Sequence, residues 1–185
     1  MKISSLFAAG LALVALSAAA QTYTVQPPIS QTYVPLAGAT PVTVSEADDG
    51  FAIIALGFTF PYYGQNYTTV HVNTNGFLAF GNAAVCETGF GCYNGDAIPS
   101  TTRSTNIHNL IAPWWDDLSV ASPGQVRVLR AAGQIEIEYA GVRSLGSTYT
   151  MSFTVKLTAA GTIEIRYGTM TGSGGSATVV PDSAE

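Results

Sequence analysis

Strict alternation of apolar and polar side chains over residues 134–167 constrains the fold more than any other feature of this chain. Apolar side chains occupy every second position in three runs, residues 135–139, 149–157 and 163–167. Successive side chains of a β-strand point to opposite faces, whereas a helix repeats every 3.6 residues. The pattern therefore predicts antiparallel strands with one buried face and one wet face.

The turn between the last two runs predicts how they pair. Ala159-Ala160-Gly161 fits a three-residue loop with glycine in the left-handed conformation. Counting outward from this loop, apolar side chains face apolar ones and a lysine faces a glutamate. The expected pairs are Thr158 with Thr162, Lys156 with Glu164, Val155 with Ile165, and Phe153 with Tyr167.

The rest of the chain also consists of short strand-like runs separated by turns. Strands are expected at residues 51–60, 67–72, 77–80, 109–115 and 125–129, and weaker ones at residues 33–36 and 177–180. Gly57 is the expected bulge, and Asn75-Gly76 is a strong hairpin signal. About ten short strands without a helical repeat predict an all-β fold, an antiparallel β-sandwich, with a β-barrel as the alternative.

The N-terminus has the pattern of a cleaved signal peptide. Lys2 precedes an apolar stretch at residues 6–16, and Ala18-Ala19-Ala20 places small residues before Gln21. We therefore expect a secreted or cell-surface protein. The predicted organisation is a signal peptide at 1–20, a Pro-rich N-terminal segment or edge strand at 21–45, a β-sandwich domain at 46–170 and a Gly/Ser-rich segment at 171–185. The sequence leaves open whether this chain is a fragment of a longer protein.

Net charge limits the classes of binding partner, and the two cysteines predict a disulfide. The formal net charge is −5 and the chain has no basic run, so nucleic acid and anionic membranes are poor partners. Cys86 and Cys92 are expected to form a disulfide that closes a short loop, as is usual in exported proteins. Neither His71 nor His108 lies at a zinc-site spacing from them.

Several motifs in fixed order resemble a known family. They are residues 58–64 (FTFPYYG), 75–81 (NGFLAFG) and 109–118 (NLIAPWWDDL), followed by the alternating strands up to Gly168. This order resembles the extracellular β-domain of plexin-domain-containing proteins and, more loosely, nidogen-like domains, which also occur in secreted bacterial proteins. The resemblance implies an extracellular, non-catalytic module and supplies no catalytic residues to carry over.

Asp116 and Asp117 are the most chemically distinctive pair. Carboxylate oxygens are ligands that calcium prefers, so these two residues are the candidate metal ligands. Strand alternation would place the two side chains on opposite faces, which favours a structural reading in which one Asp accepts backbone N–H groups while a Trp fills the core. The acidic turn Asp48-Asp49-Gly50 adds ligands only if the fold brings it near Asp116.

Aromatic residues provide a second candidate site. Most of them are expected in the core, but adjacent Tyr62 and Tyr63 must point to opposite sides of a strand. An exposed aromatic ring can stack on a sugar. The candidate ligand-binding residues are Tyr62, Tyr63, Tyr67 and Trp115.

These observations predict a secreted, non-enzymatic binding or adhesion module. Its expected partner is an extracellular protein or carbohydrate, and no cofactor is expected apart from calcium. One alternative is a secreted hydrolase that uses Asp116, Asp117 or His108, although no Gly-x-Ser-x-Gly motif places a nucleophile. The other is a structural component of a surface assembly.

Overall fold

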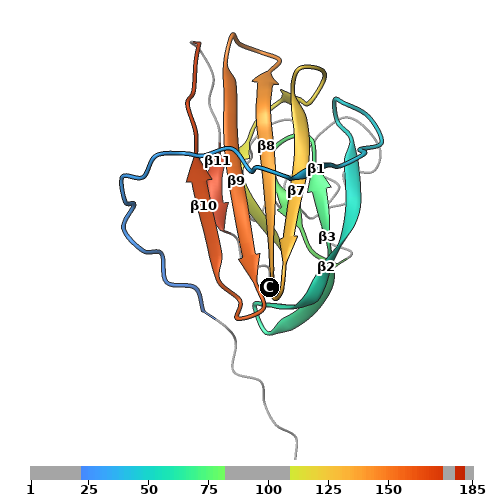
Figure 1. Ribbon diagram of the computed structural model, residues 1–185, viewed down its shortest axis with the longest axis vertical. Coiled ribbons are helices and arrows are strands. Elements are labelled where there is room, and N and C mark those ends of the chain that lie inside the picture. The colour runs from blue at the N-terminus through green and yellow to red at the C-terminus, as the bar shows by residue number, and fades with distance from the viewer. Residues whose placement is uncertain (1–21, 82–108, 173–177, 182–185) are drawn as a thin grey trace, which may run out of the picture.

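The computed structural model describes residues 22–81, 109–172 and 178–181, and within these ranges the chain forms eleven β-strands and no helix. The strands build two antiparallel sheets that lie face to face (Figure 1). The strands are β1 Thr40–Pro41, β2 Phe51–Tyr62, β3 Gln65–Asn73, β4 Leu78–Ala79, β5 Leu110–Trp115, β6 Leu118–Ser119, β7 Gln125–Ala131, β8 Gln134–Ser144, β9 Thr150–Thr158, β10 Ile163–Tyr167 and β11 Thr178–Pro181.

Each sheet has a simple order. The six-stranded sheet, here called sheet A, runs β1-β7-β8-β9-β10, with β6 pairing β8 off this path. The five-stranded sheet, sheet B, runs β11-β5-β4-β3-β2. Two separate antiparallel sheets with a shared core confirm the predicted β-sandwich class.

The core lies between the two sheets and is rich in stacked aromatic rings. Tyr139 and Phe153, neighbours on β8 and β9, stack with ring centroids 4.6 Å apart, and Phe60 stacks on Phe80 at 5.3 Å. All four side chains are fully buried. The alternation seen in the sequence thus places one face of β8 and β9 in this core, which is the main source of stability for such a fold.

The β9–β10 hairpin has the predicted register. Lys156 pairs with Glu164, Val155 with Ile165, and Phe153 with Tyr167. Gly161 has φ 81°, the left-handed conformation that the three-residue loop requires. Turn chemistry and hydrophobic pattern specify the same pairing, so short-range information is sufficient here.

Sheet B contains the bulge and the turn that its sequence predicts. The β2–β3 register shifts between Ala55 and Phe60, and Gly57 lies in this interval with φ 83°, so the predicted bulge is confirmed. The turn before β4 has Gly76 at φ 82°, and the N–H of Asn73 donates to the carbonyl of Phe77 at 3.0 Å.

The Pro-rich N-terminal segment differs from the weak strand expected at residues 33–36. Residues 22–36, here called the strap, contain no strand, and only β1 after them pairs with sheet A. In Figure 1 the strap rises beside β10 and crosses in front of β9 and β8. Pro27, Pro28 and Pro35 lack the N–H donors that a ladder needs, which explains the irregular path.

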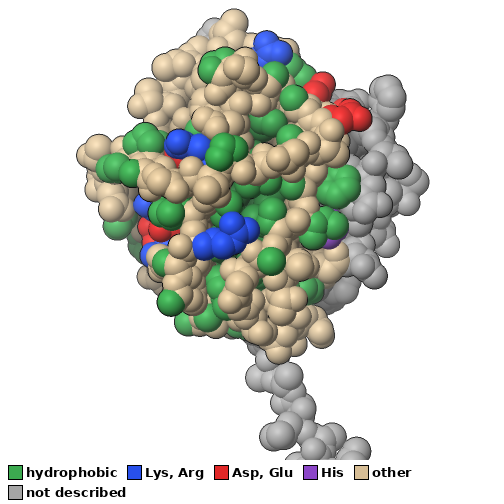
Figure 2. Space-filling model, turned by 45° about the vertical axis from the view of Figure 1, so that its right-hand side comes forward, with side chains coloured by type: hydrophobic (Ala, Val, Ile, Leu, Met, Phe, Trp, Pro, Cys, Tyr) green, Lys and Arg blue, Asp and Glu red, His purple; other side chains and the backbone are tan. Residues whose placement is uncertain are grey.

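Some predicted features fall outside the described residues. These are the signal peptide, Cys86, Cys92 and His108. Across the part of the chain that the structure describes, no helix has the length and apolar character needed to cross a membrane. On the face in Figure 2, Lys and Arg side chains lie scattered among hydrophobic and polar groups and form no continuous basic patch.

Candidate functional site

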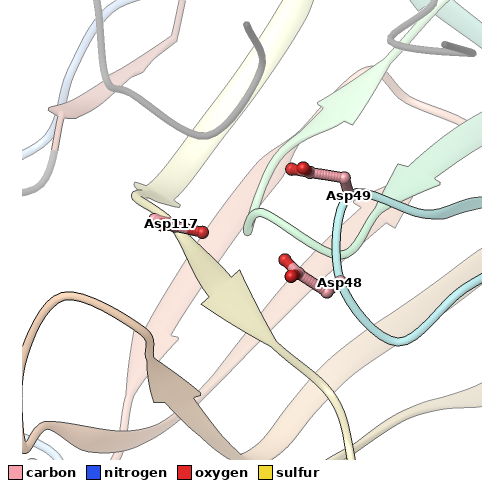
Figure 3. A group of neighbouring side chains, drawn as sticks. All are labelled: Asp48, Asp49 and Asp117. Atoms are coloured by element: carbon pink, nitrogen blue, oxygen red, sulfur yellow. The ribbon is translucent and has the colours of Figure 1, made fainter. Parts of the chain in front are cut away.

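Three aspartates from two distant segments meet at one end of the sandwich. Asp48 and Asp49 lie in the loop between β1 and β2, and Asp117 lies in the turn between β5 and β6. One carboxylate oxygen from each lies within 4.8 Å of the others. The three side chains point toward a common space in Figure 3. We call this group the aspartate cluster.

Asn75 holds these segments together. Its side chain is fully buried, its amide Nδ2 donates to Asp49 Oδ1 at 2.7 Å, and its Oδ1 accepts the backbone N–H of Leu118 at 3.0 Å. Its own carbonyl accepts the N–H of Asp116 at 3.3 Å. One asparagine in the β3–β4 turn therefore fixes both loops that carry the aspartate cluster, and its buried polar atoms are paired as they must be.

A second set of hydrogen bonds locks the acidic loop to the same turn. The N–H of Gly50 donates to Thr74 Oγ1 at 2.8 Å, and the N–H of Thr74 donates to the carbonyl of Gly50 at 2.9 Å. Asp49 itself has φ 54°, a left-handed conformation that Asp tolerates better than most residues. The loop therefore presents Asp48 and Asp49 from a defined backbone.

The carboxylates of the cluster disfavour one another's charge. Burial raises the pKa of Asp117 above its ordinary value of 3.8, and repulsion from Asp48, Asp49 and Asp116 raises it further. Burial and then repulsion from Asp49 raise the pKa of Asp48, and a hydrogen bond from the backbone of Asp49 and the charge of Arg143 partly oppose this rise. Negative charge is thus concentrated at this end of the molecule.

The cluster geometry suits a divalent cation with oxygen ligands. Calcium–oxygen distances are about 2.3–2.6 Å, so two oxygens on one ion lie at most about 5 Å apart. The 4.8 Å limit for the three aspartates meets this condition. Three carboxylates leave several of the six to eight calcium positions for water or a ligand.

Asp116 and Asp117, the two candidate metal ligands from the sequence, have different roles in the structure. Asp116 Oδ1 accepts the N–H of Asp117 at 2.9 Å, and its Oδ2 accepts the hydroxyl of Ser144 at 3.2 Å. Asp116 therefore has the turn-stabilising role that was the structural alternative. Asp117 joins Asp48 and Asp49 instead, so the acidic turn pairs with the second aspartate and not the first.

The aromatic candidates divide between core and surface. Tyr62 and Trp115 are fully buried, so neither ring is available to stack on a ligand, which corrects their assignment as ligand-binding residues. The Tyr62 hydroxyl donates to the carbonyl of Leu110 at 2.7 Å. Tyr63 and Tyr67 are partly exposed, in agreement with the expectation that only one of the adjacent tyrosines points inward.

Sequence reasoning missed Asn75 as a member of this site. The Asn-Gly pair predicts a turn, but it does not predict a role for the asparagine side chain. The sequence offers only a weak signal, an asparagine in one turn and two acidic turns in other parts of the chain. Such a residue can bond backbone and side-chain groups at once, but the sequence does not show which loops it will meet.

Comparison with known proteins identifies the chain at the level of its family. The family model described as "NIDO related" matches residues 22–180, which spans the strap and both sheets. No curated protein and no solved structure matches the chain. The likeness to nidogen-like domains is thereby confirmed, while the likeness to plexin-domain-containing and secreted bacterial proteins stays a prediction. With this match over most of its length, the chain belongs to the NIDO-related family.

Proposed function

We propose that this chain is an extracellular, non-catalytic binding module, and that a calcium ion in the aspartate cluster supports its binding surface. Membership of the NIDO-related family, which suggests an extracellular module, carries the proposal. The meeting of Asp48, Asp49 and Asp117 within 4.8 Å supports the calcium part. The partner is an extracellular protein or carbohydrate, as the low content of basic residues favours.

Thermal unfolding of the purified chain in CaCl₂ and in EDTA tests the calcium part. Extracellular calcium modules bind with dissociation constants of about 0.1–1 mM, so about 10 mM CaCl₂ should stabilise the fold by about 1.4–2.7 kcal/mol. Asp117→Asn should remove most of this increase. Glu164→Gln makes the same charge change at an exposed position on β10 and should keep it. An equal response in both variants would count against calcium at the cluster.

Binding to arrays of glycans and extracellular proteins, with and without calcium, tests the module itself. We expect a ligand whose signal weakens in EDTA. Of the four candidate aromatic residues, Tyr63 and Tyr67 are the two that are partly exposed, so Tyr67→Ala should weaken a glycan signal and leave a protein signal unchanged. Blank arrays in both conditions would contradict the proposal. So would a glycosidase or protease activity of the wild-type chain that Asp117→Asn abolishes.

A further inference from the structure

The outer face of sheet A carries a built socket for a tyrosine side chain. At its base is Glu138 on β8, a carboxylate that is fully buried although it points away from the core. The guanidinium of Arg127 on β7 donates to Glu138 Oε2 and pairs with its charge. A buried carboxylate needs such partners, because burying it without them is strongly unfavourable.

Tyr33 of the strap fills this socket. Its hydroxyl donates to Glu138 Oε1, the same oxygen that accepts the N–H of Leu36 at 3.3 Å. Burial and the hydrogen bond to Glu138 raise the pKa of Tyr33 to about 12, so the hydroxyl keeps its proton. The strap thus supplies two of the three donors to this carboxylate, and these charge-assisted bonds are stronger than neutral ones.

Gly168 provides the space for the tyrosine ring. A Cβ atom on Gly168 would lie 2.9 Å from the carbonyl oxygen of Ser152 on β9, 2.9 Å from Tyr33 Cδ1 and 3.0 Å from Tyr33 Cγ, closer than a Cβ atom approaches other atoms. The glycine directly after β10 therefore lets the ring lie against the backbone. The negatively charged acceptor Glu138 and the flat space above Gly168 together favour a phenol side chain at this position.

The rest of the strap is attached lightly. Residues 24–32 are all exposed, between Tyr23, which contacts Tyr62 and Tyr63, and Tyr33. After the socket, residues 37–39 form a turn in which Gly38 has φ 76°, and β1 then pairs with β7. A strap that is anchored at Tyr23, Tyr33 and Leu36, with exposed residues between the two tyrosines and a short turn at its base, can exchange between chains as a unit.

We infer that the strap is exchangeable, and that the socket of one chain binds Tyr33 of a second copy. The argument concerns a different surface from the aspartate cluster and goes beyond the proposed function. A second copy offers the same hydroxyl, the same Leu36 N–H and the same ring, so exchange replaces each contact with an identical one. The tethered strap has a local concentration of roughly millimolar order, so the chain's own strap occupies the socket in dilute solution.

Two complementary full-length variants prevent a chain from filling its socket with its own Tyr33. Tyr33→Ala leaves the socket intact but deprives its own strap of the tyrosine, giving an open-socket chain. Gly168→Val fills the socket but leaves the strap intact, giving a closed-socket chain. We expect each variant alone to sediment as a monomer and the mixture to form a one-to-one heterodimer. Two folded variants that never associate would overturn exchange between copies.

A peptide assay covers the case in which Gly168→Val does not fold. A fluorescent peptide of residues 22–39 should bind the open-socket chain saturably. The same peptide with Tyr33→Ala should bind about tenfold more weakly or worse, because it lacks the hydroxyl and the ring. Glu138→Gln in the open-socket chain should weaken binding of the intact peptide similarly. An open-socket chain with a normal thermal transition but no peptide binding would overturn the socket itself.

Discussion

At the scale of single residues, the geometry of the aspartate cluster depends on the β3–β4 turn. Asn75 bonds both acidic loops, and Gly76 beside it passes so close to β5 that no larger residue fits. A Cβ atom on Gly76 would lie 1.9 Å from the carbonyl oxygen of Trp114, and its φ of 82° is unfavourable for other residues. Position and conformation therefore both require glycine here.

Gly76→Ala should destabilise the protein by about 3 kcal/mol or more, because strain at this φ is combined with a backbone clash. The measurement is the free energy of unfolding in urea. Gly146→Ala is the matched control, since a Cβ there meets nothing within 4 Å, and we expect it to change stability by about 0.5 kcal/mol at most. A Gly76→Ala protein as stable as Gly146→Ala would contradict this account of the turn.

Asp117→Asn should raise stability in EDTA by a few tenths of a kcal/mol, since it removes repulsion in a partly exposed cluster. The raised pKa of Asp117 means that the folded state holds its proton more tightly than the unfolded state. This contribution to stability is largest below the ordinary pKa of 3.8 and is lost as pH rises through the folded value.

Thermal unfolding from about pH 3 to 7 in EDTA follows this effect. The wild-type chain should lose more stability across the range than Asp117→Asn does. Lower stability of Asp117→Asn at neutral pH would mean that the carboxylate makes a favourable contact, and the repulsion argument would then be wrong.

At the scale of elements, a fully buried tyrosine hydroxyl joins the two sheets. Tyr139 on β8 of sheet A donates to the carbonyl of Asn73 at the end of β3 in sheet B, at 2.7 Å. The carbonyl of Phe77 lies 3.3 Å from the same oxygen. Full burial raises the pKa of Tyr139, so the hydroxyl remains a donor.

Tyr139→Phe should cost about 0.5–1.5 kcal/mol, because it removes one buried hydrogen bond while the carbonyls of Asn73 and Phe77 keep the N–H groups of Gly76 and Asn73. Urea unfolding measures the loss. Tyr149→Phe is the control, since Tyr149 is only partly buried and its hydrogen bond to Ser147 Oγ, at 3.1 Å, comes from the backbone N–H, so we expect this change to be nearly neutral. Equal stability of the two variants would show that the inter-sheet bond contributes nothing.

Local elements could be predicted from the sequence, and contacts between distant elements could not. The β9–β10 register and the Gly57 bulge depend on neighbours in the chain, so period and turn chemistry were sufficient. Asp117 meets Asp48 and Asp49 only because two loops and the Asn75 turn converge, which no short-range pattern encodes. The burial of Tyr62 and Trp115 likewise depends on which face the opposing sheet covers.

At the scale of the whole molecule, the central strands of sheet A should be the most stable part. β8 and β9 each pair on both sides, and their inner faces carry fully buried side chains. Backbone N–H groups in such strands exchange only through large-scale opening. The strap lies at the other extreme, since residues 24–32 are exposed and outside both ladders.

Hydrogen–deuterium exchange followed by mass spectrometry should therefore show the slowest exchange in β8 and β9 and near-immediate exchange in residues 24–32. Protection at Leu36 should be intermediate, because its N–H donates to the buried carboxylate of Glu138. Uniform protection across the strap and sheet A would contradict this ranking of local stability.

The strand order also determines when the fold can be completed during synthesis, which begins at the N-terminus. β11, at Thr178–Pro181, completes sheet B beside β5, at Leu110–Trp115, so this edge stays open until the last residues of the matched region appear. The strap waits as well, because the carboxylate that receives Tyr33 lies more than 100 residues downstream. Neither the strap nor β11 can dock before the strands between them have formed. A nascent chain of this kind is committed to late, all-or-none assembly, with slow folding as its kinetic signature.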